Sequence, residues 1–155
     1  MFTKDNLEKI KKITKEFFKK TTFEIEIEVL PQKEKTIPIH LKLDEPQILI
    51  GEGGQTLAEI QHLLKAVIKR KIITEEPFYI DLDINDYKKK KIEYLKELAR
   101  SLADEAALSK KEKILPPMPA YERRIIHLEL AERRDVFSES IGQEPERKVV
   151  IKPYP

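Results

Sequence analysis

The sequence predicts an α+β protein made of two small parts that are joined by a long helix. Three segments alternate apolar and polar residues with period two, which is typical of half-buried strands. Other segments carry apolar residues at intervals of three and four, which is typical of helices. The 155 residues suit one domain or two small ones. We expect a first domain at residues 1–84 and a second at residues 85–155, which starts with the long helix.

The first part is predicted to contain its elements in the order α-β-β-α-α-β. A helix from about Asp5 to Lys20 comes first, and Asp5 with Glu8 is positioned to form a capping box at its start. The remaining elements are strands at 23–29 and 37–43, a short turn at 46–50, a helix at 56–72 and a strand at 78–84. The polar faces of the strands are acidic, so we expect polyanions to avoid them; their carboxylates are Glu24, Glu26, Glu28, Asp81 and Asp83.

A glycine cluster is the most informative feature of the first part. Three of the four glycines lie in Gly51-Glu52-Gly53-Gly54, directly before an apolar helix. Glycine permits positive φ and close approach of another backbone, and a helix start presents unpaired N–H groups. Such a loop is suited to bind phosphate. No Lys-Ser or Lys-Thr pair follows, which excludes a nucleotide P-loop, and Thr56 replaces the last glycine of a dinucleotide fingerprint. A plain glycine-rich turn remains the alternative.

The segment Ile50-Gly51-Glu52-Gly53-Gly54-Gln55-Thr56-Leu57 resembles the I-G-x-x-G-x-x-I/L signature of KH domains. The order of elements is similar to the bacterial, type II KH arrangement. This resemblance implies a loop that clamps about four nucleotides of single-stranded nucleic acid. It implies contacts from Gly51, Glu52, Gly53, Gly54, Gln55 and Thr56. Glu52 stands where a basic residue is common, and its charge should weaken binding by repulsion.

The second part is predicted to begin with a helix from Asn85 or Asp86 to about Leu108. Another helix should run from Pro119 to about Glu132, and strands at 135–142 and 147–153 should close the fold as a hairpin. Arg123 and His127 are four residues apart and hence share one helical face. A surface pair with a partly buried histidine is the alternative. The core side of this helix is expected among Ile125, Ile126, Leu128 and Leu130.

Arg-x-x-x-His, preceded by Pro-x-Tyr-Glu and followed by the hairpin, resembles the R-x3-H domain. This resemblance implies that Arg123 and His127 contact phosphate or bases, with Arg124 and Lys113 as electrostatic support. Ser138 stands where threonine is expected and keeps the hydroxyl. A KH domain followed by an R-x3-H domain resembles the bacterial Jag family, also called SpoIIIJ-associated proteins. The extra N-terminal domain of many Jag proteins is not expected here.

Composition and motifs point to a binding protein rather than an enzyme. The chain has no cysteine and a net charge of +2, and its three histidines show no metal-ligand spacing. No HExxH or GxSxG motif occurs, so we expect no catalysis, cofactor or metal. No signal stretch or membrane span is expected. We therefore predict a cytoplasmic regulator that binds single-stranded RNA, with single-stranded DNA as a second ligand. The alternative is an adaptor that binds a partner KH protein, a second copy or a membrane-associated protein.

Overall fold

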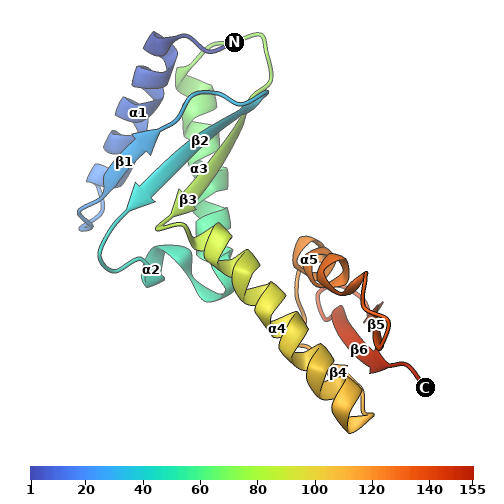
Figure 1. Cartoon of the computed structure of the whole chain (residues 1–155). Helices are drawn as coiled ribbons and strands as arrows, with labels where there is room; N and C mark the ends of the chain where they lie inside the picture. Colours follow the sequence, from blue (N-terminus) through green and yellow to red (C-terminus); the bar gives the residue numbers. More distant parts are fainter. The chain divides into compact units, whose positions relative to one another are not determined.

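The computed structural model describes residues 1–155, which form two compact units at residues 1–88 and 89–155 (Figure 1). Each unit contains a three-stranded sheet covered by helices, which confirms the predicted α+β class. The unit boundary falls inside one helix, α4 (Tyr87–Ser109). The expected division into independent domains at residue 84 stays a prediction. None of the helices is both long and apolar enough to cross a membrane.

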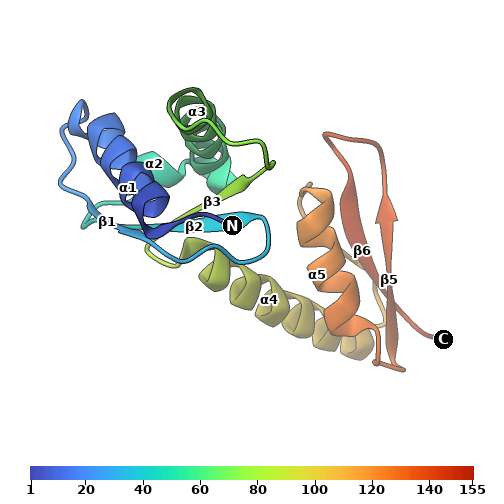
Figure 2. The same cartoon turned by 90° about the horizontal axis from the view of Figure 1, so that it is seen from above.

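The first unit places two long helices on one face of a mixed sheet (Figure 2). Strand β2 lies in the centre of the sheet, antiparallel to β1 and parallel to β3. The elements are α1 (Lys4–Lys19), β1 (Glu26–Val29), β2 (Thr36–Lys42), α2 (Gln47–Ile50), the 3-10 helix η1 (Glu52–Gly54), α3 (Gln55–Lys71) and β3 (Tyr79–Ile84).

The core of the first unit lies between these helices and the sheet. Its members alternate along the strands and recur at helical spacing along α1 and α3, which is the pattern that the sequence predicts. The most buried include Ile10, Ile37, Ile39, Leu41, Leu64, Ile68, Leu82 and Ile84. The parallel pairing of β2 with β3 brings the ends of both strands to the same side of the sheet as the glycine loop.

The start of α1 differs from the prediction. Thr3, not Asp5, is the N-cap, and its hydroxyl accepts a hydrogen bond of 3.3 Å from the backbone N–H of Asn6. Thr3 has extended backbone angles, as an N-cap requires, whereas Asp5 already lies inside the first turn. The predicted capping box is therefore wrong. Asp5 still interacts favourably with the positive end of the helix dipole.

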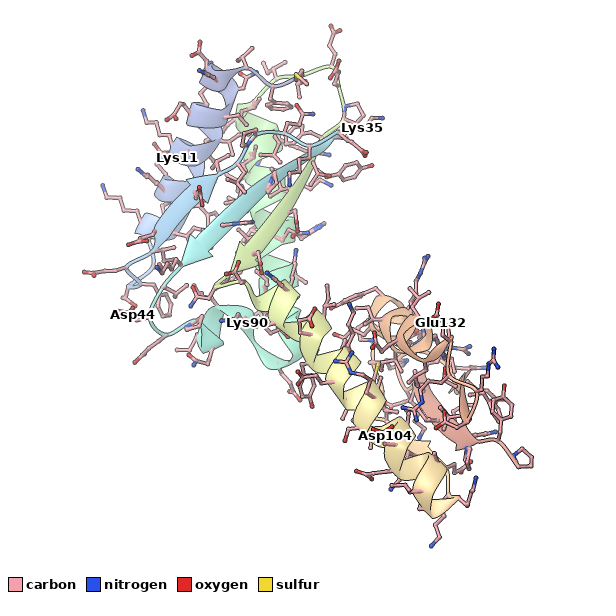
Figure 3. All side chains as sticks on the ribbon, viewed as in Figure 1. Lys11, Lys35, Asp44, Lys90, Asp104 and Glu132 are labelled. Carbon is pink, nitrogen blue, oxygen red and sulfur yellow. The ribbon has the colours of Figure 1, made fainter.

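The acidic face of the sheet is partly neutralised. In the register of β1 and β2, Glu26 lies opposite Lys42, and Asp81 on β3 forms an ion pair with Lys88. Strand β1 begins at Glu26, so Glu24 lies outside it, although the prediction placed it in the strand. Charged side chains elsewhere, such as Lys35, Lys90 and Glu132, are exposed (Figure 3).

The second unit combines two helices with a sheet in the order β4-β6-β5, in which both pairs are antiparallel. Besides α4, its elements are β4 (Lys113–Ile114), α5 (Ala120–Leu130), β5 (Val136–Ile141) and β6 (Lys148–Pro153). The sequence did not predict β4, because two residues carry no periodicity. Small side chains on α4 allow close packing at the core, which is built from Leu95, Ala99, Ala103, Ala106, Ile126, Leu130, Val136, Val149 and Ile151.

Candidate nucleic-acid interface

All three glycines of the loop have positive φ: 73° at Gly51, 60° at Gly53 and 83° at Gly54. A Cβ at Gly51 would lie 2.1 Å from the Thr56 hydroxyl oxygen, and one at Gly54 would lie 2.9 Å from the Tyr87 ring. A Cβ at Gly53 would meet nothing within 4 Å. Gly51 and Gly54 are therefore required by packing, whereas Gly53 faces open space.

The backbone N–H groups of the loop differ in whether they are free. Gly54 donates to the carbonyl oxygen of Gly51 at 3.3 Å, and Gln55 donates to that of Glu52. No backbone acceptor within the chain takes the N–H of Glu52 or Gly53. The donors available to an anion are thus those of Glu52 and Gly53, whereas the sequence pointed to Gln55 and Thr56. Thr56 is half-buried beside Gly51.

Polar side chains follow the outer edge of β3, next to α3. The side-chain oxygen of Gln61 accepts a hydrogen bond of 2.9 Å from the backbone N–H of Leu82. Lys88 donates to the same Gln61 oxygen at 3.4 Å and also pairs with Asp81. Gln61 therefore covers part of an edge strand that would otherwise present an unpaired donor.

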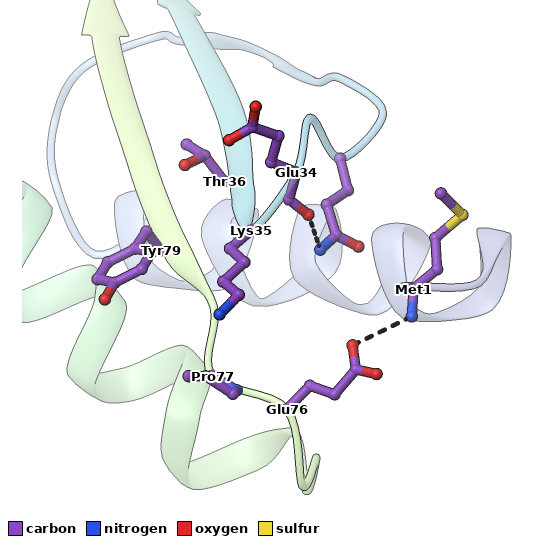
Figure 4. A pocket seen from close by; sticks show the side chains of 8 residues that line it. Met1, Glu34, Lys35, Thr36, Glu76, Pro77 and Tyr79 are labelled. Atoms are coloured by element: carbon purple, nitrogen blue, oxygen red, sulfur yellow. Dashed lines mark hydrogen bonds and ion pairs between the residues drawn. The ribbon is translucent and has the colours of Figure 1, made fainter.

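A cavity of about 750 Å³ lies at the starts of β2 and β3 (Figure 4). Thr36 and Tyr79 line it, and the N-terminal amine of Met1 pairs with Glu76 at its rim at 3.3 Å. The glycine loop follows the other ends of these strands. None of the predicted site residues lines this cavity.

Arg123, which was expected as a surface contact, is buried with 8% of its surface exposed. Its Nε donates to the carbonyl oxygen of Met118 at 3.2 Å, and its Nη2 lies 2.6 Å from the Glu144 carboxylate. The next residue, Arg124, is exposed and forms no ion pair. Arg123 therefore ties α5 to the segment before it and to the β5–β6 turn, while Arg124 offers a free cation.

His127 lies half-buried between two serines of β5. Its Nδ1 lies 2.7 Å from the hydroxyl oxygen of Ser138, and its Nε2 lies 2.7 Å from that of Ser140. Desolvation lowers the pKa of His127, and the positive charge of Arg123 lowers it further. The neutral imidazole is favoured, so one ring nitrogen donates to a serine and the other accepts from the second serine.

Lys113 lies on β4, at the opposite edge of the sheet from β5, and its amine pairs with Glu105 at 2.8 Å. The structure thus does not bring Lys113 together with His127. On α5, Ile126 and Leu130 are buried as expected, but Leu128 is 63% exposed, so its predicted place in the core is wrong. Leu128 is two residues from each of these core positions, and residues two apart on a helix do not share a face.

Sequence reasoning missed three partners of the predicted site residues. Tyr87 packs against Gly54, Glu144 pairs with Arg123, and Ser140 is bonded to His127. Only Ser140 had a usable signal, because Ser138 and Ser140 are two apart in a predicted strand and so share one face. The other two contacts join residues more than one element apart, which no local pattern indicates.

Comparison with known proteins bears on both units. Residues 93–153 match the family model of the R-x3-H domain. The RNA-binding protein KhpB of Clostridium symbiosum is 37% identical over 120 residues, which covers 77% of this chain and 53% of that protein. KhpB of Bacillus subtilis is 32% identical over 122 residues, which covers 77% and 58%. KhpB of Lactiplantibacillus plantarum is 36% identical over 104 residues, which covers 67% and 32%.

The chain spans about half the length of the Clostridium symbiosum relative, 53% of which is matched. The aligned region of 120 residues is longer than the R-x3-H domain, so the similarity extends into the first unit. The match to the domain model and the agreement among relatives from three bacteria point in the same direction. The chain belongs to the KhpB (Jag) family, with its R-x3-H domain at residues 93–153.

Proposed function

We propose that this protein binds single-stranded RNA, acts without catalysing a reaction, and uses both units for binding. The observation that carries the proposal is the similarity over 77% of the chain to relatives named RNA-binding proteins. The exposed loop donors and the exposed Arg124 supply groups that attract phosphate. Single-stranded DNA is proposed as a weaker ligand, and the cytoplasmic location stays a prediction.

The first unit is proposed to be a KH domain of the type II arrangement. Three features support this assignment. The elements follow the order α-β-β-α-α-β, strands β2 and β3 are parallel, and the Gly51-x-x-Gly54 loop connects α2 to α3. The close contact of Gly54 with Tyr87 explains the glycine at the end of the loop, and the open space at Gly53 leaves room for a ligand.

The proposed roles in the first unit follow from which backbone groups are free. The N–H groups of Glu52 and Gly53 would donate to a phosphate oxygen, because they have no acceptor within the chain. Gly51 and Gly54 hold the loop in its left-handed conformation. Thr56 supports Gly51 from below, and Gln55 lies at the rim, where its amide donates to Glu59 at 3.3 Å.

The roles in the second unit follow from burial. Arg124 is proposed as the direct phosphate contact, because it is exposed and unpaired. Arg123 is proposed as a positioning residue, since Met118 and Glu144 already hold its guanidinium. His127 is proposed to contact the ligand as a neutral ring. Lys113 contributes only a distant positive charge, because Glu105 neutralises it.

A binding titration tests the proposal directly. Fluorescence anisotropy of a labelled single-stranded RNA of mixed sequence should give saturable binding that weakens with salt. A duplex of the same sequence and a single-stranded DNA serve as comparison ligands. For single strands, each phosphate contact contributes about −0.7 to the slope of log K against log salt. Absence of saturable, salt-dependent binding to the RNA would overturn the proposal.

One observation favours a second candidate function, the binding of a protein partner. An apolar groove of about 430 Å³ lies between α1 and α3, lined by Ile13, Phe17, Leu63 and Val67 with charged residues around it. Leu63 is 55% exposed there. A second copy or another KH protein is the proposed occupant. Sedimentation velocity with Leu63→Glu tests it: loss of a concentration-dependent dimer supports self-association, whereas a monomer at all concentrations excludes it.

A further inference from the structure

A second cavity, in the second unit, has a lining unlike that of a structural gap. It measures about 370 Å³ and lies where the end of α5, the start of β5 and the segment after β6 meet. Its walls are formed by His127, Leu130, Ala131, Arg133, Val136, Phe137, Ser138 and Tyr154. A volume of this size lies within the range of small-ligand sites. Strand β5 is an edge strand, so this side of the sheet is not covered by another strand.

Two aromatic rings stand together at this cavity. The ring centroids of Phe137 and Tyr154 are 5.0 Å apart, with 41° between the ring planes. Tyr154 is 45% exposed, and its backbone N–H donates to the carbonyl oxygen of Asp135 at 2.9 Å. Neither ring belongs to the hydrophobic core of the second unit. Core packing therefore does not account for this pair, which presents an aromatic surface in a fixed position.

Arg133 adds a planar group that is held in place. Its guanidinium forms two hydrogen bonds with Asp135, at 2.9 and 2.5 Å, and one with Asp104 at 2.6 Å. Two carboxylates offset its charge, so Arg133 is poorly suited to bind phosphate. A guanidinium fixed in this way still offers a flat face, and such faces stack on nucleobases.

The polar wall is supplied by His127 and Ser138, whose Nδ1 and hydroxyl oxygen are 2.7 Å apart. The Ser138 oxygen retains a free lone pair beyond this bond, and it lies in the wall of the cavity. Aromatic and guanidinium faces combined with a hydroxyl acceptor match a flat ring that carries N–H donors on its edge. An extended peptide would leave the stacking faces unused.

We infer that this cavity binds one unstacked nucleobase of a single-stranded nucleic acid, with Tyr154 and Phe137 as the stacking surface and Ser138 at the edge of the base. The inference rests on the proposed RNA binding and deepens it by naming the part of the ligand that this site takes. Bases of single strands stack on exposed aromatic rings with little regard to sequence. The site therefore adds affinity rather than strong sequence preference.

The test compares an ordinary single-stranded RNA with an abasic ribose-phosphate chain of the same length. For Tyr154→Ala, affinity for the RNA should fall by on the order of tenfold, while affinity for the abasic chain stays unchanged. Tyr154→Phe should retain the affinity, because stacking does not need the hydroxyl. Tyr94→Ala is the matched control, since Tyr94 is 56% exposed on α4. Thermal unfolding of each variant checks that the fold is kept.

The outcomes separate this inference from the proposed function. Unchanged RNA affinity in Tyr154→Ala overturns the base site while RNA binding itself stands. Equal losses for RNA and the abasic chain also overturn it, because the contact is then to the backbone or the effect is structural. If the wild-type protein binds neither ligand, the proposed function fails and the base site fails with it.

Discussion

The guanidinium of Arg123 and the carboxylate of Glu144 form an ion pair with an N–O distance of 2.6 Å, although the two groups differ sharply in exposure. The Arg123 side chain is 10% exposed, whereas that of Glu144 is 58% exposed. Arg123 is thus a buried cation whose partner reaches in from the β5–β6 turn. A phosphate that approaches this arginine from solvent must compete with Glu144.

Because Arg123 is buried and bonded to Met118 and Glu144, its removal should destabilise the second unit. We expect Arg123→Ala to lower the free energy of unfolding by about 1–3 kcal/mol, since it leaves a buried carbonyl without its donor. Urea denaturation followed by circular dichroism measures this. Arg124→Ala, one residue away and exposed, is the control and should change stability by less than about 0.5 kcal/mol. Equal, small effects of both variants would show that Arg123 is not a structural tie.

Neutralising the competing carboxylate should have the opposite effect on binding. We expect Glu144→Gln to tighten RNA binding, because it removes a negative charge next to Arg123. Its effect on stability should stay below about 1 kcal/mol, because the Glu144 side chain is largely in solvent. Glu146→Gln on the same turn is the control for net charge. If the two variants bind RNA equally, Glu144 exerts no local competition.

The open space at Gly53 allows a mutation that acts on the ligand alone. A carboxylate introduced by Gly53→Asp would lie beside the free N–H donors of the loop and repel phosphate. We expect a loss of RNA affinity with little change in the unfolding midpoint. Gly53→Asn is the matched control, because Asn tolerates positive φ and carries no charge. If Asn and Asp reduce affinity equally, the loop geometry and not the charge is responsible.

Glu52 already carries a negative charge at the loop and is exposed. We expect Glu52→Lys to tighten RNA binding and to make the salt slope more negative by about 0.7 if one phosphate contact is gained. Glu75→Lys makes the same change in net charge at an exposed position outside the loop. The salt slope from anisotropy titrations should change only for Glu52→Lys. A similar change in both variants would mean that only overall charge matters.

How far the sequence predicts this structure depends on the distance over which each feature is decided. The strands around Ile39 and Leu82, the long helix α4 and the glycine loop follow from local periodicity and from glycine chemistry, and these predictions hold. The role of Arg123 was misjudged, because helical spacing reports which residues share a face but not what covers that face. Its partner Glu144 lies 21 residues away, in a turn with no periodic pattern.

His127 gives a prediction about pH. Burial and the charge of Arg123 lower its pKa in the folded protein, whereas the unfolded chain keeps the ordinary value of about 6.5. Above about pH 6.5 both states are neutral and the bonds to Ser138 and Ser140 are intact. As the pH falls below that value, the unfolded state takes up a proton first, so stability is lost until the pH passes the lowered folded pKa.

We therefore expect the stability advantage of the wild type over His127→Gln to shrink as the pH falls from neutrality towards 5. Urea denaturation at several pH values measures it. Asp135, whose pKa is lowered to about 2 by Arg133, stays ionised across this window and does not confuse the result. RNA affinity should not rise as His127 protonates, because its ring nitrogens are engaged with serines. A wild type that gains both stability and RNA affinity on acidification, relative to His127→Gln, would identify the imidazolium as the phosphate contact instead.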